Sequence, residues 1–103
     1  MKYGIPEKEW DRVVRTIARE ERVLGIVLYG SRAKETFRDG SDIDLCLEAP
    51  DLDFQALRKI ENDLDDLLLP WKIDVAVRQR IDDPDLLEHI GRVGKTLYLR
   101  TAG

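Results

Sequence analysis

Residues 28–45 read LYGSRAKETFRDGSDIDL and contain two polar clusters at a defined spacing. An apolar run ends at Gly30-Ser31, and after ten intervening residues the chain reaches Asp42 and Asp44. If Asp42 begins a strand, its side chains alternate between two faces, so both carboxylates share one face and their apolar neighbours are buried on the other. Two ionised carboxylates about 5 Å apart repel each other by roughly 3 kcal/mol at an effective dielectric constant near 20. A hard divalent cation would turn this repulsion into binding.

The glycine and the serine of the same segment suit a phosphate group. Glycine lets the backbone approach an anion closely. A helix that starts beside Gly30 would present unpaired N–H groups to that anion, and Ser31 would cap the helix and add a hydroxyl. The segment therefore predicts a phosphate site next to a metal site.

Around this segment, apolar residues recur first at helical and then at strand spacing, and turn residues separate the runs. We expect two long helices, from Pro6 to about Arg22 and from Asp53 to Leu69, and a last helix that begins after the cap Asp83 and ends at Gly91. A short helical turn is expected from Ser31 to about Lys34, and a further turn over Arg38–Gly40. The expected strands are Val23–Tyr29, Asp42–Leu47, Trp71–Val77 and Leu97–Leu99.

The third expected strand contains a carboxylate where an apolar residue is usual. Ile73, Val75 and Val77 share one face of this strand, and Asp74 lies on the opposite face. Strands that alternate with helices predict a small α/β sheet covered by helices. The sheet should be mixed, because the short connection between the first two strands suits an antiparallel pair.

Composition limits the classes of function. With 103 residues, 43% apolar and 37% charged, the chain is expected to form a single domain over residues 1–103 without a membrane span or a signal peptide. Cys46 is the only cysteine, which excludes an internal disulfide and predicts a cytoplasmic protein. The net charge of -4 argues against direct binding of nucleic acid.

The combination of Gly30-Ser31, Asp42-x-Asp44 and Asp74 resembles the signature of the nucleotidyltransferase superfamily that includes DNA polymerase beta. The match is strongest with the stand-alone, minimal branch of that superfamily, the minimal nucleotidyltransferases. The resemblance extends over a leading helix and the segments YGSRA, SDIDL, KIDVAV and IGRVG. It implies the nucleotidyltransferase fold, in which a small mixed sheet packs against helices.

The resemblance also implies roles for single residues. Three aspartates would bind two magnesium ions and carry out catalysis: Asp42, Asp44 and Asp74. Gly30 and Ser31 would hold the triphosphate of the nucleotide, and Arg32 would contact phosphate oxygens through its planar fork. Asp74, on the acceptor side, would also take the proton of the attacking hydroxyl. The implied reaction moves a nucleoside monophosphate, AMP from ATP, to a hydroxyl and releases pyrophosphate.

One residue departs from the family pattern. The family reads Gly-Ser-x-Ala-x-Gly, and Glu35 stands in place of the second glycine. If that position has a positive φ, Glu35 costs roughly 1 kcal/mol of strain. This amount reshapes a loop more readily than it abolishes metal binding.

The acceptor is expected on another protein, because the chain has no residues for an acceptor-binding domain. Minimal nucleotidyltransferases resemble the antitoxin of a two-protein module that adenylylates a tyrosine on a helical HEPN-domain toxin, which makes such a toxin the expected partner. Self-association is left open.

Two other interpretations compete with a protein-modifying enzyme. In the first, the fold is a catalytically relaxed module that binds a nucleotide or docks a partner. In the second, the chain nucleotidylates an antibiotic, which the missing second domain disfavours. His89, the only histidine, is expected to be a solvated residue at a helix end.

Overall fold

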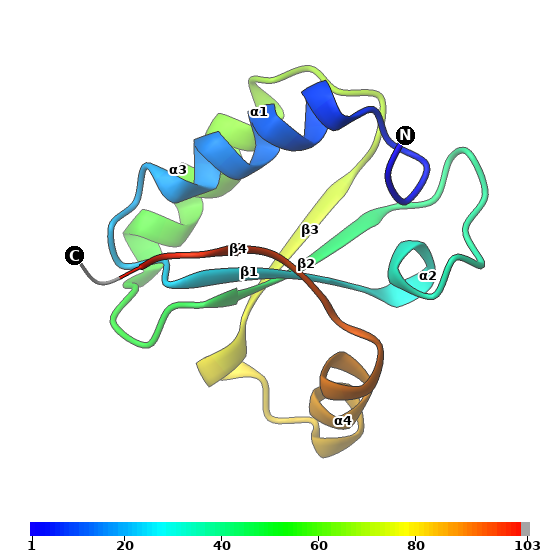
Figure 1. Ribbon diagram of the computed structural model, residues 1–103. Coiled ribbons are helices and arrows are strands. Elements are labelled where there is room, and N and C mark those ends of the chain that lie inside the picture. Colours follow the sequence, from blue (N-terminus) through cyan, green and yellow to red (C-terminus); the bar gives the residue numbers. More distant parts are fainter. Residues whose placement is uncertain (102–103) are drawn as a thin grey trace.

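The computed structural model describes residues 1–101, which form a four-stranded sheet with helices on both sides (Figure 1). The strand order is β3-β2-β1-β4. Strand β1 pairs antiparallel with β2 and β4, whereas β2 pairs parallel with β3. In chain order the elements are α1 (Glu7–Ala18), β1 (Gly25–Tyr29), α2 (Gly30–Ala33), β2 (Ile43–Glu48), α3 (Phe54–Asp65), β3 (Ile73–Val77), the 3-10 turn η1 (Arg78–Arg80), α4 (Pro84–Val93) and β4 (Lys95–Leu99).

The mixed sheet predicted from the sequence is confirmed, and the connections explain it. Helix α3 links β2 to β3, and a helical crossover of this kind lets two consecutive strands run parallel. The shorter α2 segment returns the chain antiparallel beside β1. The four predicted strands are all present, with starts that differ from the prediction by up to two residues.

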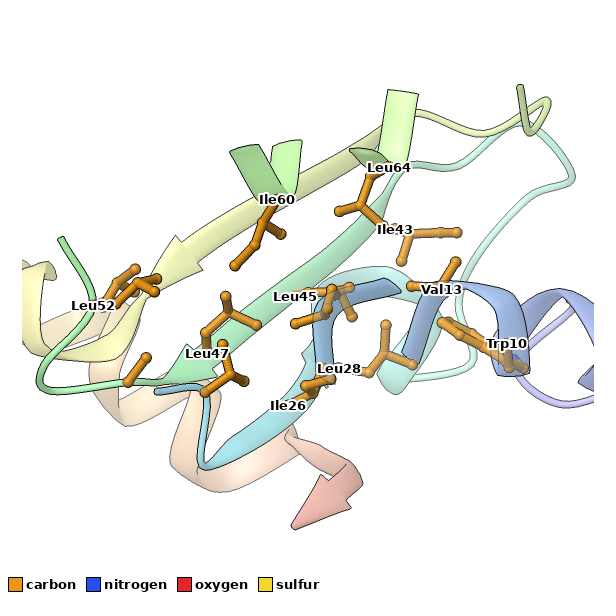
Figure 2. Packing of buried hydrophobic residues seen from close by; sticks show 14 of the residues in the cluster. Trp10, Val13, Ile26, Leu28, Ile43, Leu45, Leu47, Leu52, Ile60 and Leu64 are labelled. Carbon is orange, nitrogen blue, oxygen red and sulfur yellow. The ribbon is translucent and has the colours of Figure 1, made fainter. Parts of the chain in front are cut away.

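The core lies between the sheet and the helix pair α1 and α3 (Figure 1). Side chains from β1 and β2 point into this layer and meet residues of both helices (Figure 2). Those that are less than 1% exposed include Ile26, Leu28, Ile43, Leu45 and Leu47. Because strand side chains alternate, the residues between them face the opposite side, which α4 covers only in part. We call this side the open face.

Two predicted helices end earlier than expected. Helix α1 stops at Ala18 rather than Arg22, and Arg100 donates hydrogen bonds to the carbonyl oxygens of Ala18 and Glu20 there. Helix α3 stops at Asp65 rather than Leu69, because Leu68 adopts a positive φ of 55° and turns the chain before Pro70.

Helix α4 is longer than predicted. Asp83 caps its start as expected, since its Oδ1 accepts a hydrogen bond from the Asp85 N–H at 2.9 Å. Gly91 does not end the helix, which continues to Val93. At Gly94 an added Cβ would lie 2.7 Å from a side-chain carbon of Val27, so the glycine allows the chain to pass close to β1. Within residues 1–101, no helix has the length and apolar character needed to cross a membrane.

Candidate active site

The three predicted aspartates gather at one end of the open face. Asp44 pairs with Asp74 in the parallel register of β2 and β3, and with Tyr29 in the antiparallel register of β1 and β2. These three residues therefore form one row across three strands, with their side chains on the same face. Asp42 precedes β2 by one residue, and the alternation along the chain places it on the side of Asp44.

The charges of this group act on one another. The pKa of the Asp44 carboxyl is raised, first by burial and then by the negative charges of Asp74 and Asp42, while His89 and Lys72 act in the opposite direction. Lys72 Nζ lies 3.7 Å from Asp74 Oδ1. Ionising Asp44 therefore costs more in the folded protein than in the unfolded chain, and a cation beside it would relieve that cost.

Gly30 is required at the junction between β1 and α2. Its φ is +75°, a conformation that disfavours other residues. An added Cβ would overlap Asp44 Oδ2 and would lie 3.2 Å from Asp44 Cγ. The glycine thus lets the Asp44 carboxylate lie directly against the backbone. Gly30-Ser31, the pair predicted to bind phosphate and called the phosphate segment below, therefore lies beside the carboxylates.

Ser31 lies at this junction in a different role from the one predicted. Tyr29, with an extended backbone, is the residue that precedes the helix, and Ser31 belongs to the first turn rather than capping it. Helix α2 is only four residues long, so its macrodipole is small. The first-turn N–H groups and the Ser31 hydroxyl remain the groups able to face an anion.

Arg32 does not lie in the site. Its side chain is 1% exposed and packs 5.0 Å from the Phe37 ring centroid. Its guanidinium donates hydrogen bonds to three backbone carbonyls, those of Tyr3, Asp39 and Ser41, at 2.8–3.1 Å. The predicted contact with phosphate is therefore replaced by a structural role, in which Arg32 fixes the loop that leads to Asp42.

Glu35 has a positive φ of 60°, which is the condition under which the sequence predicted strain. Its side chain is exposed, and its N–H donates to the Arg32 carbonyl at 3.2 Å. The substitution for glycine is therefore accommodated in a left-handed conformation at a cost of about 1 kcal/mol.

Two aromatic residues beside the carboxylates were not identified from the sequence. Burial, followed by the charge of Asp44, raises the pKa of Tyr29 to about 12. The His89 ring packs edge to face on Tyr29, with centroids 6.3 Å apart. The prediction of a solvated helix end was wrong, because His89 lies half-buried within α4. His89 is three residues from Leu86 and four from Val93, and this helical spacing indicates that it shares the apolar face of the helix.

The donor set of this site fits magnesium. Within residues 1–101, no three acidic, histidine or cysteine side chains form a ready-made metal cluster. Magnesium does not need one, because it binds through one or two carboxylates and completes its shell with water and substrate phosphates. The Asp44 carboxyl, whose pKa is raised by burial and by the charges of Asp74 and Asp42, matches this mode of binding.

Comparison with known proteins adds a family and a fold. A family model described as "Polymerase beta, Nucleotidyltransferase" matches residues 11–102. No curated protein matches the chain significantly.

Among solved structures, a toxin-antitoxin with AMP-PNP superposes with a TM-score of 0.73 and 22% identity, over 88% of this chain and 73% of the other. A tri-AMPylated Shewanella oneidensis HEPN toxin in complex with MNT antitoxin gives a TM-score of 0.69 and 20% identity, over 91% and 72%. A toxin-antitoxin MntA-HepT gives a TM-score of 0.68 and 20% identity, over 92% and 74%. At these identities the likeness shows a shared fold.

Proposed function

Because the chain belongs to the polymerase beta nucleotidyltransferase family, we propose that it transfers AMP from ATP to a hydroxyl group on a partner protein. The observation that carries this proposal is the junction of Gly30 with Asp44. There, a backbone turn suited to phosphate lies in contact with the Asp44 carboxyl, whose pKa is raised by burial and by its acidic neighbours.

The residues of the site divide the reaction between them. The acceptor oxygen attacks the α-phosphorus of ATP, the bond from that phosphorus to the bridging oxygen breaks, and pyrophosphate leaves. Gly30 and Ser31 hold the triphosphate through backbone N–H groups and the hydroxyl. Asp74, at the β3 side of the site, takes the proton of the acceptor hydroxyl.

Asp42, Asp44 and Asp74 would hold two magnesium ions. Bound magnesium would lower the pKa of the acceptor hydroxyl and neutralise the leaving pyrophosphate. Since the reaction uses ATP and magnesium, we expect the protein to act in the cytoplasm.

The partner is proposed to be a helical HEPN-type toxin, with this chain as its antitoxin. Support comes from the shared fold with an MNT antitoxin whose HEPN toxin partner is tri-AMPylated, and with a toxin-antitoxin that holds AMP-PNP. A groove of about 280 Å³ beside Asp74, lined by Leu64, Leu69, Trp71 and Lys72 among others, is open to an incoming segment of such a partner.

Co-expression with the product of the neighbouring gene tests the proposal. We would measure the intact mass of the partner in the presence of wild type, Asp44→Asn or Asp42→Asn, with Asp51→Asn as the control for an exposed loop carboxylate. The expected result is an added AMP with wild type and with Asp51→Asn, and none with the two site variants.

An unmodified partner that copurifies with wild type would instead support the second interpretation, a module that acts by binding alone. The observation that favours this second interpretation is Glu35, which has a positive φ and stands in the place of the family glycine.

A further inference from the structure

The proposed nucleotide needs more hydrogen-bond donors for its phosphates than the predicted site residues supply. A triphosphate would enter a site that already contains three carboxylates, and the guanidinium of Arg32 is committed to backbone carbonyls elsewhere. Lys72 is positioned beside Asp74 at the far strand. The opposite side of the site, next to Gly30, is the side on which the phosphates would lie.

His89 is the side chain that reaches this opposite side. Its ring packs on Tyr29 at 6.3 Å and 82°, and Tyr29 both precedes Gly30 in the chain and faces Asp44 across the strands. The influence of His89 on the pKa of Asp44 agrees with this proximity. One aromatic contact therefore places the imidazole beside the phosphate segment.

The helix that carries His89 is held in position at both ends. Asp83 caps its start, and at its end Gly94 passes so close to β1 that an added Cβ would lie 2.7 Å from a side-chain carbon of Val27. Helix α4 also contacts β1 and α2. The ring is consequently presented to the site before a nucleotide arrives, which lowers the entropic cost of using it.

We propose that His89 is a nucleotide-binding residue whose ring N–H donates a hydrogen bond to a triphosphate oxygen. The inference rests on the proposed function and extends it to a residue outside the family signature. A neutral or a protonated imidazole can make this contact, since each carries at least one N–H donor.

A purely structural role for His89 predicts different behaviour in two matched variants. His89→Phe keeps an aromatic ring against Tyr29 and removes the N–H donor. His89→Gln keeps a donor and removes the ring. The neighbouring Glu88→Gln is the control on the same helix, because Glu88 is exposed and pairs with Arg92 at 3.0 Å.

The test is calorimetric titration of each protein with AMP-PNP in the presence of magnesium, together with its melting temperature. We expect His89→Phe to weaken AMP-PNP binding about tenfold or more at an unchanged melting temperature, because hydrogen bonds to charged groups contribute about this much. His89→Gln should retain more affinity than His89→Phe, and Glu88→Gln should match wild type.

Equal affinity of wild type and His89→Phe would overturn the inference and leave the proposed function intact. A loss of affinity in His89→Gln alone, accompanied by a lower melting temperature, would assign His89 to packing and would also overturn it. If wild type itself fails to bind AMP-PNP, both the inference and the proposed function fail.

Discussion

At the scale of single residues, Gly30 is required both for the backbone conformation after β1 and for the close approach of the Asp44 carboxylate. We predict that Gly30→Ala lowers the free energy of unfolding by about 2 kcal/mol, because alanine is strained at positive φ and its Cβ meets Asp44. Transfer of AMP should be lost as well. Urea denaturation measures the first effect, and Gly40→Ala is the control, since a Cβ there meets nothing within 4 Å. Equal losses in the two variants would contradict the prediction.

Asp44 is expected to lower the stability of the metal-free protein and to bind the metal. Its folded pKa lies above the unfolded value, so at neutral pH its ionisation costs stability, and this cost disappears as the pH falls below the unfolded value. Asp44→Asn should therefore raise the melting temperature by a few degrees in EDTA at neutral pH. Magnesium should stabilise wild type and leave Asp44→Asn unchanged. A variant that still responds to magnesium would exclude Asp44 as a ligand.

Much of the candidate site follows from the sequence at this scale, because strand alternation and a fixed spacing bring Gly30, Asp42, Asp44 and Asp74 together. The position of Arg32 could not be predicted. Its carbonyl acceptors come from segments before and after it in the chain, and no local pattern reports such contacts.

At the scale of elements, Arg32 holds the loop between α2 and β2 in place. Arg32→Ala would remove the side-chain donor to the carbonyls of Tyr3 and Ser41 and one of the two donors to the Asp39 carbonyl. We therefore predict a loss of about 3 kcal/mol in the free energy of unfolding without nucleotide. Arg32→Lys should recover only part of it, since an ammonium lacks the planar fork. Urea denaturation at constant pH measures both. If Arg32→Ala kept full stability but bound AMP-PNP more weakly, Arg32 would be assigned to phosphate binding instead.

The turn between α1 and β1 should weaken in acid. Hydrogen bonds from Arg22 lower the pKa of Glu20 to about 2. A lowered carboxyl pKa stabilises the fold above the unfolded value of 4.5, and this contribution is lost as the pH falls from 4.5 to about 2. The stability difference between wild type and Glu20→Gln should be constant near neutral pH and shrink over that range. Glu21→Gln, at an exposed neighbour, is the matched control in urea denaturation.

The types of element were predictable from periodicity, whereas several of their ends were not. Helix α3 has the apolar period of a helix through Leu68, but a local turn ends it earlier, in which the Leu68 N–H donates to the Asp65 carbonyl and Leu68 has a positive φ. Helix α1 ends where Arg100, distant in the sequence, binds its last carbonyls. The apolar period reports neither the local turn at Leu68 nor the contact with a residue as distant in sequence as Arg100.

At the scale of the whole molecule, one core joins the sheet to α1 and α3. We predict a single cooperative unfolding transition, in which far-ultraviolet circular dichroism and tryptophan fluorescence coincide. Trp10 reports the core and Trp71 reports the margin of the sheet, so Trp10→Phe and Trp71→Phe separate the two signals. Two distinct midpoints would contradict the prediction of a single domain.

The register that aligns Tyr29, Asp44 and Asp74 also limits how the gene can change in length. Loss or gain of one codon within β2 would turn every following side chain to the other face, moving a carboxylate into the core and a core residue onto the open face. Folding and catalysis would fail together, so selection would remove such a frame-preserving change at once. Inherited changes in length are expected instead in exposed segments outside residues 30–44, such as the turn at Pro50 and Asp51 between β2 and α3.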